Sequence, residues 1–129
     1  MTSLLRVNPQ TVHPPIATYS HVVCVPQTAR RVVFAGQVGV RLDGSIVDDA
    51  EGQVVQVVTN LNALLAHQGL GAAHIVRMTV YLTDSALLPL WQKHRPALIG
   101  EYAPASTLVY VAGLADERLK IEVEMEAAG

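Results

Sequence analysis

The chain has a single cysteine, Cys24, in 129 residues. One thiol cannot form an internal disulfide, which argues against a small secreted domain held together by disulfides and favours a reducing compartment. We therefore expect a cytoplasmic protein. Cys24 lies in a run of strand-forming residues with no general base next to it, so we interpret it as a buried, unreactive thiol and not as a nucleophile.

A strong charge of either sign is also missing. Nine Lys and Arg residues stand against 11 Asp and Glu residues, the net charge is −2, and the basic residues are scattered. Such a chain offers no surface for a phosphate backbone or an anionic membrane. No segment approaches the roughly 18 apolar residues of a membrane span, and the N-terminus lacks the apolar core of a signal peptide. We expect neither nucleic acid nor membrane as a partner.

Metal-binding spacings are absent too. The histidines show no HxH or HExxH arrangement, so the sequence predicts no metal site. The five histidines are His13, His21, His67, His74 and His94.

The chain is rich in aliphatic residues that can form a hydrophobic core. Hydrophobic residues make up 50% of it and aromatic residues only 5%, so the core must be packed mainly from aliphatic side chains. This length suits a single domain over residues 1–129. The apolar surplus in so small a domain also favours a buried subunit interface.

The first half of the sequence predicts strands and then a helix. Two β-branched runs, 18–25 and 31–35, flank a short proline-containing turn and predict an opening hairpin. Residues 38–47, interrupted by Asp43-Gly44, predict a second turn or loose hairpin. Asp48-Asp49 can cap a helix over 50–68 that Gly69 would end. The apolar stripe of this helix is Val54, Val58, Leu61 and Leu65.

The second half predicts a strand, a helix and two closing strands. Residues 75–82 form the strand, and Val76, Met78, Val80 and Leu82 share one face of it. A helix follows over 85–100, kinked or ended near Arg95 by Pro96. The segments 107–111 and 119–125 are strands, and the last alternates apolar and charged residues. The order ββ(β)αβαββ predicts an α+β fold, with two helices on one face of a mixed, mainly antiparallel sheet.

Seven short segments follow one another along the chain: Ala17-Thr18-Tyr19-Ser20, Val33-Phe34-Ala35-Gly36-Gln37, Gln56 with Asn60-Leu61, Gly69-Leu70, the run from Ile75 to Asp84, Pro104-Ala105, and Lys120-Ile121-Glu122-Val123-Glu124. In this order and at nearly this spacing, they resemble the RidA/YjgF family of reactive-intermediate (imine) deaminases.

The resemblance covers nearly the whole chain and implies a chorismate-mutase-like fold, a homotrimer and a ligand cleft at each subunit interface. In that family the cleft binds small 2-imino or 2-enamino acids. Water replaces the imine nitrogen, giving a keto acid and ammonia, and no cofactor is implied.

Carried over residue by residue, the resemblance implies catalytic roles for Glu122, which would orient water, and for Tyr19. The implied substrate-binding positions are Gly36, Gln37, Gln92 and Ser106, and Thr107, next to Ser106, is a further candidate for holding a neutral ligand. Two of them depart from the family pattern. Gln92 stands at the usual asparagine, and Ser106 stands at the usual carboxylate-binding arginine.

The change at position 106 removes a planar, charged fork that would bind a carboxylate through two hydrogen bonds. Losing such a partner costs about 2–5 kcal/mol of binding, or tens to thousands of fold in affinity. Two cations are candidate substitutes, Arg95 on the second helix and Arg118 before the last strand. For each of them, a solvated surface arginine is the stronger interpretation, because most isolated surface arginines are solvated.

The sequence leaves other roles open. Glu122 can act on water or simply face solvent on an amphipathic strand. Tyr19 can be a site residue or an ordinary strand aromatic. Gly36 can admit a ligand close to the backbone or serve a bulge.

Three functions therefore remain to be weighed. The first is a diverged imine or enamine deaminase with altered substrate preference. The second is a trimer that binds a small metabolite without turnover. Ribonuclease activity, sometimes attached to this family, comes last because the chain has no basic groove or paired catalytic histidines.

Overall fold

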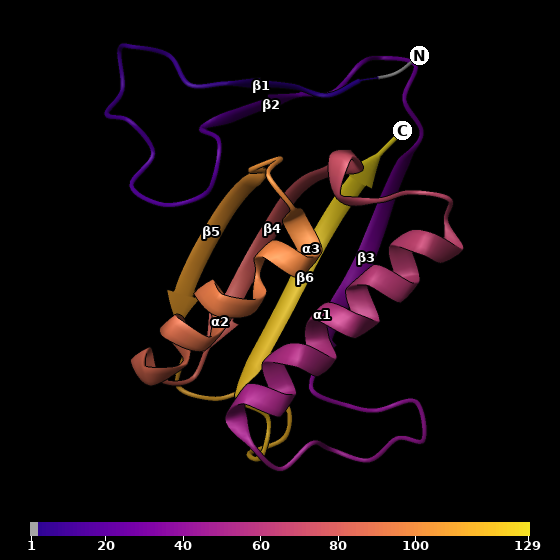
Figure 1. Ribbon diagram of the computed structural model, residues 1–129, viewed down its shortest axis with the longest axis vertical. Coiled ribbons are helices and arrows are strands. Elements are labelled where there is room, and N and C mark those ends of the chain that lie inside the picture. Colours follow the sequence, from indigo (N-terminus) through magenta and orange to yellow (C-terminus); the bar gives the residue numbers. More distant parts are fainter. Residues whose placement is uncertain (1–2) are drawn as a thin grey trace.

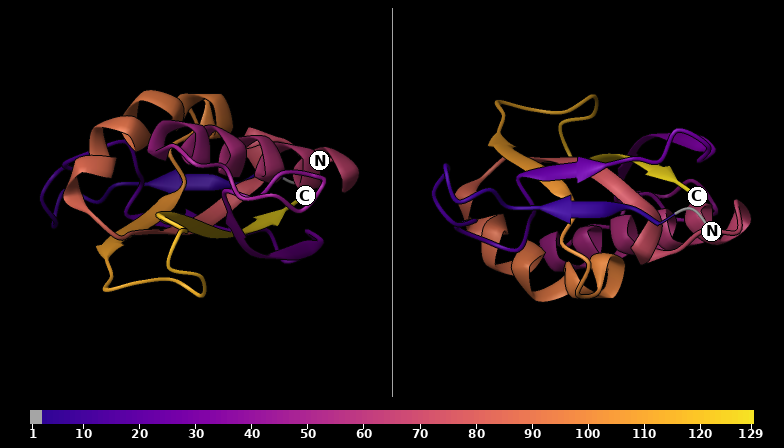
Figure 2. Two further views of the ribbon diagram at one scale, coloured as in Figure 1. Left: turned by 90° about the horizontal axis from the view of Figure 1, so that it is seen from below. Right: turned by 90° about the horizontal axis from the view of Figure 1, so that it is seen from above.

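A four-stranded sheet with helices on one face forms the body of the molecule. The computed structural model describes residues 3–129, and Figures 1 and 2 show the helices together on one side of the sheet. The strands lie in the order β3-β6-β4-β5. Strand β6 is antiparallel to both of its neighbours, whereas β4 and β5 are parallel. Their bounds are β3 Arg31–Val38, β4 Ile75–Leu82, β5 Ala105–Tyr110 and β6 Ile121–Ala128. The predicted α+β class is confirmed.

Helix α1 (Ala50–His67) begins and ends close to the predicted residues. The carboxylate of Asp49 accepts a hydrogen bond from the Gly52 backbone N–H at 2.8 Å and so caps the first turn. Beyond the helix, Gly69 has a φ of +70°, a conformation that glycine adopts without strain. The whole predicted apolar stripe of α1 is buried against the sheet.

A proline divides the second helical region, as predicted. A short 3₁₀ turn (Ser85–Leu87) leads into α2 (Leu88–His94), and α3 (Pro96–Ile99) follows the break at Arg95. Another 3₁₀ turn (Ala72–His74) precedes β4. Because β4 and β5 are parallel, the α2–α3 segment is the crossover that connects them. It seals its end of the core with Trp91 and Leu98, each 1% exposed.

The predicted opening hairpin is wrong. Strand β2 (Val22–Cys24) pairs with β1 (Leu5–Val7), while β3 joins the main sheet beside β6. The β1–β2 ribbon crosses one end of the main sheet (Figure 1). Arg6 helps to hold it there by donating a hydrogen bond to the carbonyl of Ala73 at 2.9 Å.

Two single-residue expectations also fail. Cys24 is exposed, because it belongs to the thin β1–β2 ribbon and not to a strand of the core sheet. Val76 is only half-buried, and Ile75 takes its place in the core. The pairing of β4 with β6 shifts register between Ile75 and Arg77, and such an irregularity interrupts strict alternation of the two faces.

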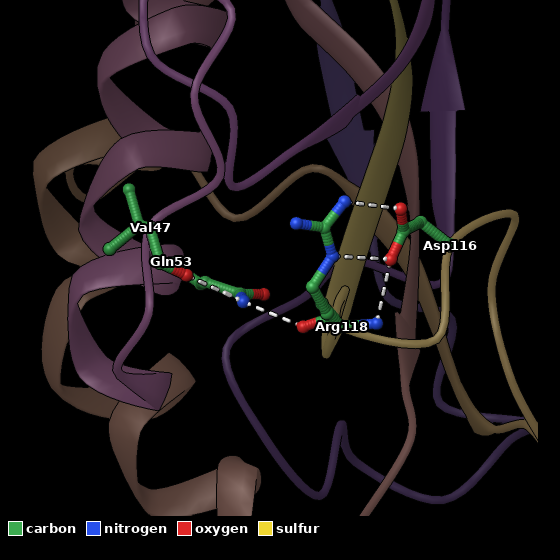
Figure 3. A network of polar contacts seen from close by, with 4 residues as sticks. All are labelled: Val47, Gln53, Asp116 and Arg118. Carbon is green, nitrogen blue, oxygen red and sulfur yellow. Dashed lines mark hydrogen bonds and ion pairs between the residues drawn. The ribbon is translucent and has the colours of Figure 1, made fainter.

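A buried glutamine fixes the start of β6. The side-chain amide nitrogen of Gln53 donates to the carbonyls of Val47 and Arg118, both at 2.9 Å, and Figure 3 shows these contacts. Its carbonyl oxygen accepts from the Lys120 backbone N–H at 2.8 Å. Gly39 allows this approach, since a Cβ there would collide with Gln53. The clamp therefore ties α1 to the loop before it and to the segment that enters β6.

Within residues 3–129, none of the helices combines the length and apolar character needed to cross a bilayer.

Candidate functional site

A cavity of about 500 Å³ lies between β5, α2 and the segment before β2. It brings together five of the residues that the sequence analysis selected, namely Tyr19, Gln92, Arg95, Ser106 and Thr107. The remaining lining residues are Ile16, Ala17, Thr18, Leu88, Trp91 and Leu108.

The segment over 16–19 is held in place by the residue that follows it. Ser20 is 4% exposed, and its hydroxyl donates to the carbonyl of Ala103 at 2.6 Å. Its backbone N–H donates to the carbonyl of Pro104 at 3.2 Å. Both acceptors immediately precede β5, so these bonds place Tyr19 beside the strand that carries Ser106. The Tyr19 hydroxyl accepts a weak hydrogen bond from the Ile16 backbone N–H at 3.4 Å.

Arg95 is the one cation in the cavity lining, and it occupies the joint between α2 and α3. Its Nη2 donates to the Thr18 hydroxyl at 3.3 Å, while its buried Nε has no hydrogen-bond acceptor among residues 3–129. No Asp or Glu in the described part of the chain forms an ion pair with it. Burial lowers the pKa of Arg95, because the charged guanidinium is partly removed from water.

The polar residues beside Arg95 are neutral. Ser106 is half-buried on β5, where it lies opposite Met78 of β4, and Thr107 is exposed. Gln92 is exposed on α2. The cavity thus offers one positive charge with hydroxyl and amide groups, and its lining contains no carboxylate.

The other selected residues lie at the opposite edge of the sheet. Gly36 and Gln37 are on β3, and Glu122 is on the adjoining strand β6, opposite Val38. A Cβ at Gly36 would collide with the Glu122 carboxylate. Glycine at position 36 therefore leaves room for this side chain over the β3 backbone, next to an irregularity in the β3–β6 pairing.

Glu122 differs from the two glutamates that follow it on the same face of β6. Glu124 accepts a hydrogen bond from the Tyr81 hydroxyl at 2.6 Å, which raises the pKa of Tyr81. Glu126 pairs with Arg31 at 2.7 Å, and this bond lowers the pKa of Glu126. No group in the described chain donates a hydrogen bond to Glu122, so among these three its carboxylate is free to act on a bound molecule.

A second hollow of about 470 Å³ borders this edge of the sheet, between β3 and α1. Gly36 and Gln37 line it together with Gln56 and Asn60 of α1. Asn60 accepts from the Gln56 amide at 2.8 Å and donates to the Val40 carbonyl at 3.0 Å. The bond from Asn60 to Val40 holds the segment that follows β3 against the helix.

One chain does not unite the two groups of residues. Gly36 and Gln37 are on the outer strand β3 and Glu122 is on the adjoining β6, and β4 separates both strands from β5 at the other edge of the sheet. Arg118 belongs to neither group. It binds Asp116 through two side-chain hydrogen bonds of 3.1 and 2.8 Å (Figure 3), and it does not line the cavity.

Thr18, Trp91 and the apolar lining residues were not selected from the sequence as site residues. Trp91 carried the signal of a core residue, which it also is. Thr18 precedes Tyr19 in the sequence, but its role in the site becomes visible only through the hydrogen bond that its hydroxyl accepts from Arg95. Residues 3–129 contain no cluster of three or more His, Cys, Asp or Glu side chains suited to a metal ion.

Comparisons with known proteins agree with the fold. The profile of the family described as endoribonuclease L-PSP matches residues 10–129. A RutC family protein of Pyrococcus abyssi (strain GE5 / Orsay) is 31% identical over 115 residues, which cover 88% of this chain and 86% of that protein. Another, from Aquifex aeolicus (strain VF5), is 32% identical over 71 residues, 54% of each chain. The latter match spans only about half of its relative's length.

Among solved structures, YyfB of the conserved Rid protein family from Yersinia pestis is 29% identical, with a TM-score of 0.86, and the match covers 97% of this chain and 98% of that one. It is described as a protein of unknown function. With 120 residues matched by the family profile and a relative above 30% identity along most of its length, the chain belongs to the endoribonuclease L-PSP family, the RidA/YjgF family that its sequence resembles.

Proposed function

We propose that this protein hydrolyses a small imine or enamine to a carbonyl compound and ammonia, in a site built from two copies of the chain. The observation that carries the proposal is the separation of the site residues within one sheet: Ser106 and Thr107 are on the outer strand β5, whereas Gly36, Gln37 and Glu122 are on β3 and the adjoining β6. The β5 edge has a cavity without a carboxylate, and the β3 edge has a free carboxylate outside that cavity. A ring of copies, most simply the homotrimer of the family, would place the β3 edge of one copy against the β5 edge of the next.

The chemistry follows from the groups that this contact would bring together. Glu122 of one copy removes a proton from water as the water oxygen bonds to the imine carbon. The carboxyl group of Glu122 returns this proton to the imine nitrogen, which gives a neutral tetrahedral intermediate. The hydroxyl proton of the intermediate then passes through the same carboxylate to the amine, so that ammonia leaves as the C=O bond forms. In this proposal the Tyr19 hydroxyl of the other copy forms a hydrogen bond with the reacting group. None of these reaction steps uses a cofactor.

Ser106 is the reason to expect an altered substrate preference. Its hydroxyl supplies one neutral hydrogen bond on β5, where the family's arginine would supply a charged pair. Substrate orientation must then depend on other lining groups of the cavity, such as Gln92 and Thr107.

A complementation experiment tests the composite site. Glu122→Gln and Tyr19→Phe variants are each assayed for ammonia release from freshly generated imines, then mixed, unfolded and refolded together. If each site uses Glu122 from one copy and Tyr19 from the next, random mixing restores about one quarter of the sites to the native pair. Activity that stays at the level of the separate variants would contradict a site shared between copies.

A non-catalytic role in binding a metabolite is the alternative, and the absence of a carboxylate from the cavity lining favours it. In that case the refolded native trimer would bind small ligands saturably and release no ammonia from any imine. We expect either activity to take place in the cytoplasm.

A further inference from the structure

We propose that Arg95 is the carboxylate receptor of the cavity, so that the ligand is a 2-oxo or 2-imino acid with a bulky apolar side chain. The inference deepens the proposed function, because it names the ligand class of the same site. It moves carboxylate recognition from the strand, where Ser106 stands, to the joint between α2 and α3.

The first argument is that Arg95 has donors without partners. Some arginines have carboxylate partners, since Arg31 pairs with Glu126 and Arg118 with Asp116 at 2.7 and 2.8 Å. Arg6 shares with Arg95 a buried Nε without an acceptor, but Arg6 does not line the cavity. Arg95 has only the 3.3 Å bond to Thr18, and its buried Nε has no acceptor in residues 3–129. A guanidinium presents a fork of N–H groups that matches a carboxylate, so a bound acid would supply the missing acceptors.

The second argument is the position of the charge within the cavity. Ser106, Thr107 and Gln92 line the same space, and their neutral groups can accept or donate hydrogen bonds beside a bound carboxylate. No acidic residue lines the cavity to repel or displace it. The bond from Arg95 to Thr18 also restrains the guanidinium in this wall of the cavity.

The third argument concerns the rest of the ligand. The apolar residues Ile16, Leu88, Trp91 and Leu108 also line the cavity. Its volume of about 500 Å³ is far more than a three-carbon acid fills and lies in the range of ordinary small-molecule sites. A branched aliphatic or aromatic side chain would cover this wall, whereas a methyl or methylene group would leave it wet.

A competing partner for Arg95 is Glu122 of the partner subunit, which the proposed assembly brings to the same cleft. An internal ion pair of this kind would hold the copies together and leave no free receptor. The experiment must therefore separate ligand recognition from assembly.

The test uses calorimetry on the native protein. It measures the affinity for 4-methyl-2-oxopentanoate, for the uncharged amide of this acid and for pyruvate. We expect the six-carbon acid to bind at least about tenfold more tightly than its amide and than pyruvate. Arg95→Gln should remove the preference for acid over amide, and Arg95→Lys should keep part of it. Arg118→Gln is the matched control and should change neither ratio.

Equal binding of acid and amide by the native protein would overturn the inference, and this measurement needs no variant. An unchanged acid preference in Arg95→Gln would overturn it as well. So would a fall in solution mass in Arg95→Gln without a change in that preference, because it would assign Arg95 to the subunit contact.

Ammonia assays separate this inference from the proposed function. Selective binding of the acid that depends on Arg95, without turnover of any imine, would support Arg95 as the carboxylate-binding residue and contradict the deaminase function. Turnover of imines without a preference for the acid would support the deaminase function and contradict the role of Arg95.

Discussion

The β5 edge and the β3 edge of the sheet differ in what they could contribute to a shared site. The β5 edge carries a cavity with a cation, neutral polar groups and an apolar wall. At the β3 edge, the carboxylate of Glu122 on the adjoining strand β6 lies over Gly36 of β3. The difference suggests a division of labour, in which one edge holds the ligand and the other activates water. Substitutions at the two edges should then affect different measured quantities.

The largest effect is expected from Glu122→Gln at the β3 edge. Loss of the general base should lower turnover by about 100- to 10,000-fold while ligand affinity changes little. Ammonia release and ligand binding are measured on the same preparation. Glu124→Gln, two residues along the same face, is the control and should stay within a few fold of the native rate. Equal losses in the two variants would remove the distinction between these carboxylates.

Gln53→Met should have the next largest effect, on stability. Methionine keeps roughly the side-chain volume but leaves the Lys120 N–H and the Val47 and Arg118 carbonyls without their partner. We expect a loss of about 2–4 kcal/mol in the free energy of unfolding, measured by denaturant titration. Gln56→Met, at a half-buried position of the same helix where the side chain donates one hydrogen bond, to Asn60, should cost about 1 kcal/mol or less. An equally large loss in Gln56→Met would show that the hydrogen bonds of Gln53 contribute no more to stability than those of another glutamine on the helix.

A smaller effect is expected from Ser20→Ala at the β5 edge. The change removes the 2.6 Å bond to the Ala103 carbonyl that anchors the segment carrying Tyr19. It should cost about 1 kcal/mol of stability and raise KM more than it lowers kcat. Steady-state kinetics with a reactive imine gives both constants. A drop in kcat alone would mean that Ser20 affects the chemical step and not ligand binding. The β5 edge would then not act mainly in binding, as the comparison of the two edges requires.

The smallest effect concerns Asp116→Asn, outside both edges. Arg118 holds the pKa of Asp116 at about 2, below the usual value near 3.8. The folded chain thus binds this proton less readily than the unfolded chain, so the pair stabilises the fold above the unfolded pKa. That contribution fades as the pH falls from about 4 through about 2. Tm measured against pH should fall slightly less steeply in Asp116→Asn over this window, because the pair is exposed and screened. A steeper fall in the variant would reverse the expected sign.

Local patterns predicted much of this fold. The stripe and cap of α1, the proline break at Arg95 and the alternation of β6 each arise from neighbouring residues, and each appears in the structure. The pairing of β2 with β1 was missed, because β1 has only 3 residues and its partner is far along the chain. The register shift after Ile75 was missed for the same reason, since a strand partner and not the local sequence sets it.

The candidate site, too, could be predicted from the sequence only in part. The family resemblance selected residues in both groups, but only the sheet order shows that β4 lies between Glu122 on β6 and Ser106 on β5. Sequence also treated Arg95 and Arg118 alike. The structure distinguishes them, because Asp116 binds Arg118 whereas Arg95 lines the cavity. Charge partners are tertiary facts, and no local pattern supplies them.

The break at Pro96 has a consequence for how such a protein can evolve. A receptor on a strand cannot move by one position without turning to the opposite face of the sheet. A receptor at a joint between two short helices is free of that restriction, because the joint can lengthen, shorten or swivel while the strand register stays intact. The α2–α3 crossover could therefore let new specificities arise on an unchanged sheet.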